Sequence, residues 1–184
     1  MVSLPVLFAY IIPGLGTNWL RLWEFNTRWR LGRFRPHHGF VFGSSISLLA
    51  LLCVVPPAAN FRVFEMLGAG FITGSTLAFW NWLYDIQAIK VGLLVVYNRP
   101  YAQQGGPEAI ATDYAPLFFG VFGGCYGLAI YLGQHLFLTL GRWEMFWALF
   151  IGCLLILLAM PVLAYLAYSY LKYGDAGLKP FTGE

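Results

Sequence analysis

The sequence predicts an all-α integral membrane protein, a single domain over residues 1–184 built as a bundle of about five transmembrane helices with short loops. The first observation is composition, because 59% of the residues are hydrophobic and only 10% are charged, whereas soluble domains carry about 25% charged residues. The second is that five apolar stretches approach the roughly 20 residues that a helix needs to cross a hydrocarbon layer. The third is the aromatic content of 18%, which suits the aromatic belts at membrane surfaces.

The five predicted spans cover residues 2–22, 39–58, 67–97, 116–140 and 145–171. The first is interrupted by Pro13, Gly14 and Gly16, so we expect a kinked or partly interfacial helix there. The third is too long for one perpendicular crossing, so we expect it to tilt or to protrude before Pro100 stops it.

The basic residues predict the orientation of the bundle. If the first span runs inward, the connections 23–38 and 98–115 and the C-terminal tail share one side of the membrane. Of the 11 Lys and Arg residues, all but Arg62 and Arg142 belong to that side. Basic residues are enriched on the inner side of membranes, so we expect the N-terminus outside and the C-terminus inside.

Four arginines of the first connection are interspersed with aromatic residues, at Arg28, Arg30, Arg33 and Arg35. Such a segment is expected to lie in the headgroup region, with its guanidinium groups on lipid phosphates. Two interpretations stay open, a lipid-binding segment and a plain determinant of topology. Membrane lipids are expected partners, whereas nucleic acid is not, because the basic stretch is tethered between two spans.

Asp85 is the costliest residue of the predicted bundle. It lies inside the third apolar stretch, where an ionised carboxylate is unfavourable by about 2.5–3.5 kcal/mol. It must therefore be paired, protonated or exposed to water. Gly70 and Gly74 share its helix face, and Asn81 lies one turn before it. Asp85 and Asn81 are the candidate catalytic residues.

Small residues predict where the third and fourth spans meet. The pattern consists of Gly70 and Gly74 in the third span and Gly120, Gly123, Gly124 and Gly127 in the fourth. Pairs of glycines four residues apart let two helices approach closely. We therefore expect a tight antiparallel pair with Asp85 in the contact, and Tyr126 near enough to hydrogen-bond Asn81 or Asp85.

A lone carboxylate in a span has a functional and a structural interpretation. In the functional one, Asp85 carries a proton or coordinates a cation. In the structural one, it is a polar clasp that fixes the register of two helices. The sequence favours the clasp, because no second carboxylate within the spans continues a proton path. A cavity beside Asp85 that opens to the inner leaflet would favour an enzyme, and a filled clasp would favour a subunit.

The cofactor is open on sequence grounds, with a lipid, a quinone and a pigment as candidates. His135, near the outer end of the fourth span, is the one candidate within the spans for an axial ligand of a haem or chlorophyll. Trp80 and Trp82 lie at mid-depth, which suits contact with a lipid tail, a pigment or a partner subunit. Together with Tyr126 these are the candidate binding residues. No metal site is expected, because the three cysteines are far apart in apolar runs.

Three functions follow from these features. The first is an accessory or structural subunit of a larger membrane complex, such as a respiratory or photosynthetic one that carries out electron transport. The alternatives are a small intramembrane enzyme that acts on a lipid or isoprenoid through Asp85, and a proton-coupled carrier. The sequence favours a subunit over an enzyme, because it holds no nucleophile with a base and no nucleotide-binding loop.

Overall fold

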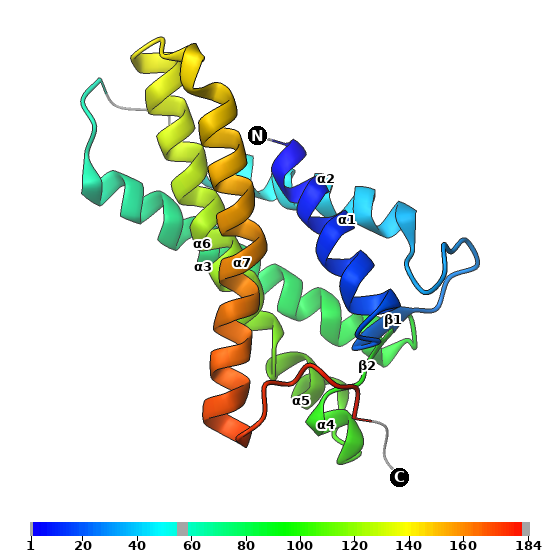
Figure 1. Ribbon diagram of the computed structural model, residues 1–184. Coiled ribbons are helices and arrows are strands. Elements are labelled where there is room, and N and C mark those ends of the chain that lie inside the picture. The colour runs from blue at the N-terminus through cyan, green and yellow to red at the C-terminus, as the bar shows by residue number, and fades with distance from the viewer. Residues whose placement is uncertain (1, 55–58, 182–184) are drawn as a thin grey trace.

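The computed structural model describes residues 2–54 and 59–181, and most of this part of the chain is helical. A bundle of helices is completed by a small ribbon of two strands (Figure 1). In chain order, the elements are α1 Ser3–Asn18, β1 Trp23–Phe25, α2 Pro36–Cys53, α3 Val63–Lys90, β2 Leu94–Val96, α4 Arg99–Ala102, α5 Pro107–Thr112, α6 Ala115–Gln134, a π-helical segment His135–Thr139, a 3-10 turn Trp143–Met145 and α7 Phe146–Tyr173.

Two helical pairs and one long crossing helix make up the bundle. α6 and α7 run side by side, α1 and α2 form a second pair, and α3 crosses α6, its most extensive partner (Figure 1). In addition, α2 contacts α3 and α1 contacts α7. The core between these helices includes Phe8, Ile46, Leu77, Phe122 and Leu157. One core therefore joins all five long helices.

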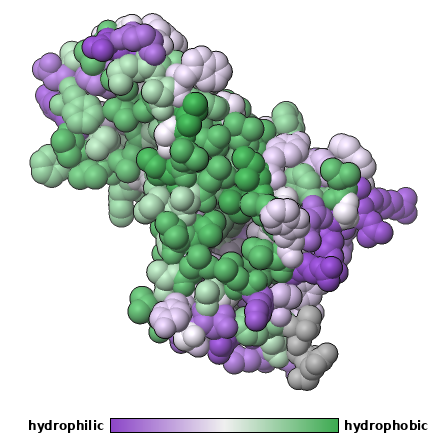
Figure 2. Space-filling model, in the orientation of Figure 1, coloured by the Kyte–Doolittle hydropathy of each residue, from purple (hydrophilic) through white to green (hydrophobic). Residues whose placement is uncertain are grey.

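Four helical stretches are long and apolar enough to cross a membrane, namely Pro36–Cys53, Val63–Lys90, Pro107–Thr139 and Trp143–Tyr173. The described chain is thus compatible with an all-α membrane protein. α1 has 16 residues, a length of about 24 Å, which is less than a hydrocarbon thickness of about 30 Å. Figure 2 shows apolar residues over the middle of one face and hydrophilic ones at the α6–α7 turn and around the loop after β1.

The third helix ends earlier than its hydropathy predicts. α3 stops at Lys90 and not at residue 97, because the chain turns at Gly92, whose φ of +72° lies in the left-handed region that glycine adopts without strain. Leu94–Val96 then forms β2 and pairs antiparallel with β1. Apolar, β-branched residues suit a strand as well as a span, so hydropathy alone does not distinguish the two in this segment.

The other helix boundaries differ less from the predicted spans. α2 begins at Pro36, where proline suits the first helical position. It ends at Cys53, and residues 55–58 of the predicted second span lie outside the described residues. α7 ends at Tyr173, because Gly174 takes up a left-handed φ of +70°.

The connections at one end of the bundle fold together into a layer that we call the cap, which comprises β1, β2, α4, α5 and residues 174–181 (Figure 1). The Tyr97 N–H donates to Leu22 O at 2.8 Å, and the Phe181 N–H donates to Tyr97 O at 2.9 Å. Three parts of the chain that are distant in sequence thus share hydrogen bonds. This end of the bundle is a folded layer, and the expectation of short loops is wrong here.

Glycines let α3 and α6 pack closely. The contact contains Gly70, Gly74, Gly120, Gly123, Gly124 and Gly127. A Cβ on Gly123 would lie 2.8 Å from Thr73 O, and one on Gly74 or Gly127 would likewise collide with a backbone carbonyl of the facing helix. Gly124 differs, because the nearest atom to its Cβ would be 3.9 Å away. The tightest contact is therefore at Gly74, Gly123 and Gly127.

Candidate functional site

A cavity of about 260 Å³ lies between α1, α6, α7 and the cap. Figure 2 shows a recess in the apolar face between α1 and α7. The apolar lining includes Phe8, Ile12, Phe118, Phe119, Val162 and Leu166. The polar lining includes Arg33, Arg35, His38, Asp85, Asn98, Tyr114 and Tyr165. An apolar pocket with a few polar groups is the usual form of a site for a small molecule.

Asp85 belongs to the wall of this cavity. It projects from α3 and is 3% exposed. The Tyr114 hydroxyl, immediately before α6, donates to Asp85 Oδ2 over 2.5 Å. The other carboxylate oxygen, Oδ1, takes no part in this bond. The phenol thus orients the carboxyl group of a residue that lines the cavity.

Such a carboxyl group is suited to acid–base chemistry. It is surrounded by apolar side chains of the cavity, where a proton transfer meets little competition from water. Tyr114 holds the group in one orientation, as a catalytic or proton-binding carboxyl requires. The arrangement also satisfies the clasp interpretation, since the bond joins α3 to the start of α6. The cavity is the feature that a clasp alone does not need.

Asn81 and Tyr126 are not part of this group. The Asn81 side chain donates to Leu77 O of its own helix at 2.7 Å, and the Tyr126 side chain bonds to Ser47 of α2. The expectation that Tyr126 meets Asp85 or Asn81 is wrong. Because Gly74 lies against Gly120, Asp85, about three turns further along α3, reaches the residues that precede α6.

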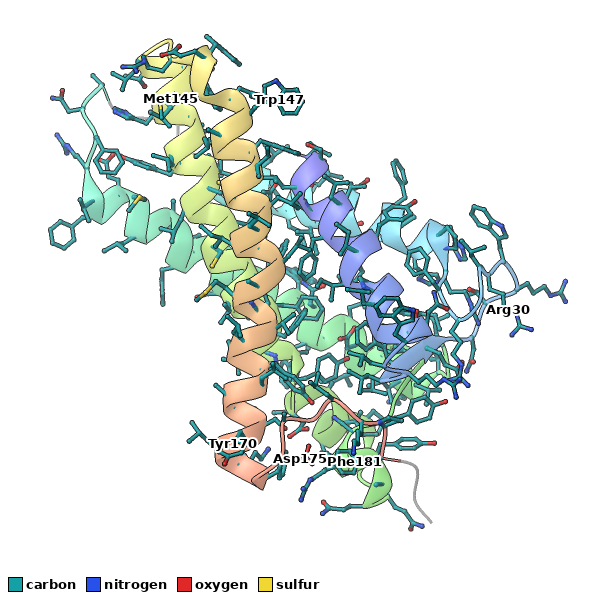
Figure 3. The ribbon with its side chains drawn as sticks, viewed as in Figure 1. Arg30, Met145, Trp147, Tyr170, Asp175 and Phe181 are labelled. Carbon is teal, nitrogen blue, oxygen red and sulfur yellow. The ribbon has the colours of Figure 1, made fainter. Side chains whose placement is uncertain are left out.

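Two of the four arginines of the first connection line the cavity. These are Arg33 and Arg35, whereas Arg28 and Arg30 are exposed, and Figure 3 shows Arg30 directed away from the bundle. Arg35 is 5% exposed and donates from Nη1 to Arg33 O at 2.9 Å. Burial lowers the pKa of Arg35, and the charge of Arg30 adds to this effect. Arg35 is therefore enclosed by residues of this chain, whereas Arg28 and Arg30 lie on its surface.

Aromatic stacking holds the start of α2 beside these arginines. The His38 ring lies on Phe25 of β1 with centroids 4.3 Å apart and planes 19° apart. His37 stacks on Trp29 at 5.4 Å. His38 lines the cavity together with Arg35. Ring contacts thus fix the loop between β1 and α2. They hold Arg33 and Arg35 at the cavity.

A second polar cluster ties the cap to the end of α7. Asp113, which precedes Tyr114, is buried and accepts hydrogen bonds at Oδ1 from Lys172 Nζ at 2.8 Å and from the Tyr173 hydroxyl at 2.5 Å. Asn98 Nδ2 donates to the other oxygen at 3.3 Å. The cluster fixes the backbone beside Tyr114, and thereby the position of the phenol that holds Asp85.

The segment 174–181 covers one side of the cavity. Phe181 lines the cavity and lies under the Arg99 guanidinium, whose carbon is 5.2 Å from the ring centroid. Figure 3 shows Phe181 at the end of this segment, within the cap. The Tyr97 hydroxyl, on the same side, donates to Glu24 Oε1 at 2.7 Å. Burial and the bond to Glu24 raise the pKa of Tyr97 to about 12. At neutral pH Tyr97 is therefore a protonated donor.

The remaining candidate residues lie away from this cavity. Trp82 donates its indole N–H to the Thr112 hydroxyl at 2.9 Å, so this chain itself supplies the partner that we expected from outside. Trp80 is 53% exposed. His135 is buried, and its ring meets Phe61 edge-on with centroids 5.3 Å apart. His135 is thus separate from the Asp85 site.

Within residues 2–54 and 59–181, no three His, Cys, Asp or Glu side chains gather closely enough to hold a metal ion. Comparisons with known proteins gave no match, since no family model, no curated protein and no solved structure is similar to this chain. The site must therefore be interpreted from its own chemistry.

Sequence reasoning missed Tyr114 and Asp113. Both lie at the boundary between a predicted loop and the fourth span, where polar residues are ordinary and attract no notice. A signal was present, since a buried carboxylate in a span needs a donor, and tyrosines at the ends of neighbouring spans are natural candidates for that donor. The register of α3 on α6 was needed to choose among them.

Proposed function

We propose that this chain is a multi-pass membrane protein that holds a lipid-like molecule in the cavity and exchanges a proton with it through Asp85. The observation that carries the proposal is the buried Asp85–Tyr114 pair in the wall of an otherwise apolar cavity. The enzyme interpretation, a lipid or isoprenoid as substrate and Asp85 as general acid or base, follows from it.

The shape and lining of the cavity support this class of ligand. Side chains of α1, α6 and α7 give it apolar walls, and the recess between α1 and α7 opens on an apolar face of the molecule (Figure 2). Apolar walls accept the hydrocarbon part of such a ligand without leaving a buried polar group unpaired. A ligand that resides in a bilayer would enter from the side without crossing water.

The role of Asp85 follows from its partners. Tyr114 donates to Oδ2, so Oδ1 is the oxygen that accepts a proton from the ligand or returns one to it. Tyr114 stabilises the carboxylate form while the proton is on the ligand. Asp85 is positioned by α3, and Tyr114 by the junction between α5 and α6. The Asp113 cluster holds this junction in place.

A photoreactive long-chain alcohol tests the cavity. Hexadecanol that carries a diazirine is expected to crosslink to peptides of α1, α6 and α7 in phosphatidylcholine nanodiscs. Val162→Trp fills the cavity, and we expect it to lower this labelling about tenfold, equivalent to about 1.4 kcal/mol of lost binding. Leu163→Trp is the matched control, because Leu163 is the next residue of α7 and faces outward. Peptide mass spectrometry measures both.

Equal labelling of the two tryptophan variants would contradict the proposal. The second candidate function, an accessory subunit of a larger membrane complex, would then remain. The exposure of Trp80 favours this candidate. This indole is 53% exposed on α3 beside the exposed Phe79, and an indole N–H is poorly satisfied by hydrocarbon. A second protein chain or a chromophore that copurifies in mild detergent would then support the subunit.

We also propose that the cap lies on the inner side of the membrane. Nine of the 11 Lys and Arg residues lie in the cap or in the segments next to it at this end of the bundle, and basic residues are enriched on the inner side of membranes. In a cysteine-free background, Gln103→Cys in the cap is expected to react with an impermeant maleimide only after the membrane is opened. Asn60→Cys, beyond the opposite end of the bundle, is expected to react in intact cells. The reverse pattern would overturn this orientation.

A further inference from the structure

We propose that Arg33, Arg35 and His38 bind the phosphate group of an amphipathic ligand whose hydrocarbon part occupies the cavity. This inference rests on the proposed function and names the class of ligand. All three side chains line the cavity. They come from one short segment, the end of the loop after β1 and the start of α2.

Arg35 is the first observation behind this assignment. Its side chain is 95% buried, its Nη1 is bonded to the backbone oxygen of Arg33, and its Nε has no hydrogen-bond partner among the residues that the structure describes. A buried cation without a counter-ion is costly. An anion in the cavity would offset that cost.

The charges around Arg35 are the second observation. The ion pairs within the described chain do not include Arg33 or Arg35. Glu24 is the acidic group whose charge acts on Arg35, and Arg30 opposes it. One oxygen of Glu24 already accepts the Tyr97 hydroxyl. The segment therefore keeps an excess of positive charge toward the cavity.

The start of α2 is the third observation. α2 has 18 residues, and its N-cap, Arg35, provides no side-chain hydrogen bond to the first turn. Pro36 has no N–H, and the His38 N–H donates to Arg35 O at 3.0 Å, so this end of the helix favours an anion mainly through its dipole. His38, in that first turn and stacked on Phe25, presents its ring to the same space.

Phosphate fits these groups better than a neutral polar head. A guanidinium group offers paired N–H donors that match two phosphate oxygens, and Arg35 has free donor capacity at Nε. The rest of the cavity has an apolar lining that includes Phe8 and Leu166, and this lining suits a hydrocarbon chain. A phosphate monoester or diester of a long-chain alcohol combines both features.

Two photoreactive probes of equal chain length test the inference. One is the diazirine-bearing hexadecanol, and the other is its phosphate monoester, each added to the protein in maltoside detergent micelles, which carry no phosphate that could compete. We expect the phosphate probe to label cavity peptides about tenfold more than the alcohol, because hydrogen bonds between a guanidinium group and a phosphate are charge-assisted. Arg35→Gln and Arg33→Gln should each remove most of that preference, measured as the ratio of labelling by the two probes within the same variant. Arg30→Gln, outside the cavity, should keep the preference.

The outcomes separate the two proposals. If neither probe labels the cavity, the proposed function fails. If both label it equally, or if the preference survives in both arginine variants, the anion site is wrong while the cavity stands. Arg33 is exposed at the cavity mouth, so Arg33→Gln keeps the test valid should Arg35→Gln not fold. Inorganic phosphate at millimolar concentration is expected not to compete, and full competition by it would assign the site to a free anion instead.

Discussion

Gly123→Ala is expected to lower the free energy of unfolding by about 1–3 kcal/mol, the usual cost of extra volume in a packed interface. The added Cβ would lie 2.8 Å from Thr73 O and 2.9 Å from the Cα of Gly74. Both are backbone atoms, so relief requires α3 and α6 to move apart. Thermal unfolding in detergent, followed by loss of the monodisperse peak in size-exclusion chromatography, measures the effect.

Gly124→Ala is the matched control, because Gly124 is the next residue of the same helix and its Cβ would have 3.9 Å of room. Alanine is favoured over glycine in a helix by about 1 kcal/mol, so this variant is expected to be neutral or stabilised. A Gly123→Ala protein as stable as Gly124→Ala would show that α3 and α6 do not pack at the described distance.

Tyr114→Phe is expected to destabilise the protein by about 1–3 kcal/mol, because it removes the hydroxyl that donates to the buried Asp85 carboxylate. Asp85→Asn should cost less, since the amide oxygen still accepts from Tyr114. If Asp85 exchanges protons with the ligand, the same Asp85→Asn variant loses that reaction while it retains the fold. Chemical denaturation of the purified variants in one detergent gives the stability differences.

The double variant Asp85→Leu with Tyr114→Phe provides the internal check. Replacing both polar partners by apolar groups of similar size removes the unmet acceptor, so it should recover much of the stability that Tyr114→Phe loses. Tyr170→Phe is the control for a phenol on the surface of α7, where the side chain is exposed. Equal stability of Tyr114→Phe and Tyr170→Phe would contradict a structural role for the bond to Asp85.

Hydropathy and glycine spacing determined the helical character of the chain and the likeness of four stretches to membrane spans. These are local properties, since about 20 apolar residues in succession suit a span whatever lies beside them. The cost of Asp85 in an apolar helix is equally local. It singled out the residue around which the candidate site is built, although the sequence favoured a clasp.

Only the tertiary structure decided what surrounds Asp85. The register of α3 on α6, set by Gly74 and Gly123, brings Asp85 to Tyr114 and keeps it from Tyr126. β2 separates from α3 because it pairs with a strand that is distant in sequence. The folding of the segment between β1 and α2 likewise brings Arg33 and Arg35 to the cavity that Asp85 lines. Each outcome depends on contacts between distant segments, which hydropathy along one segment does not contain.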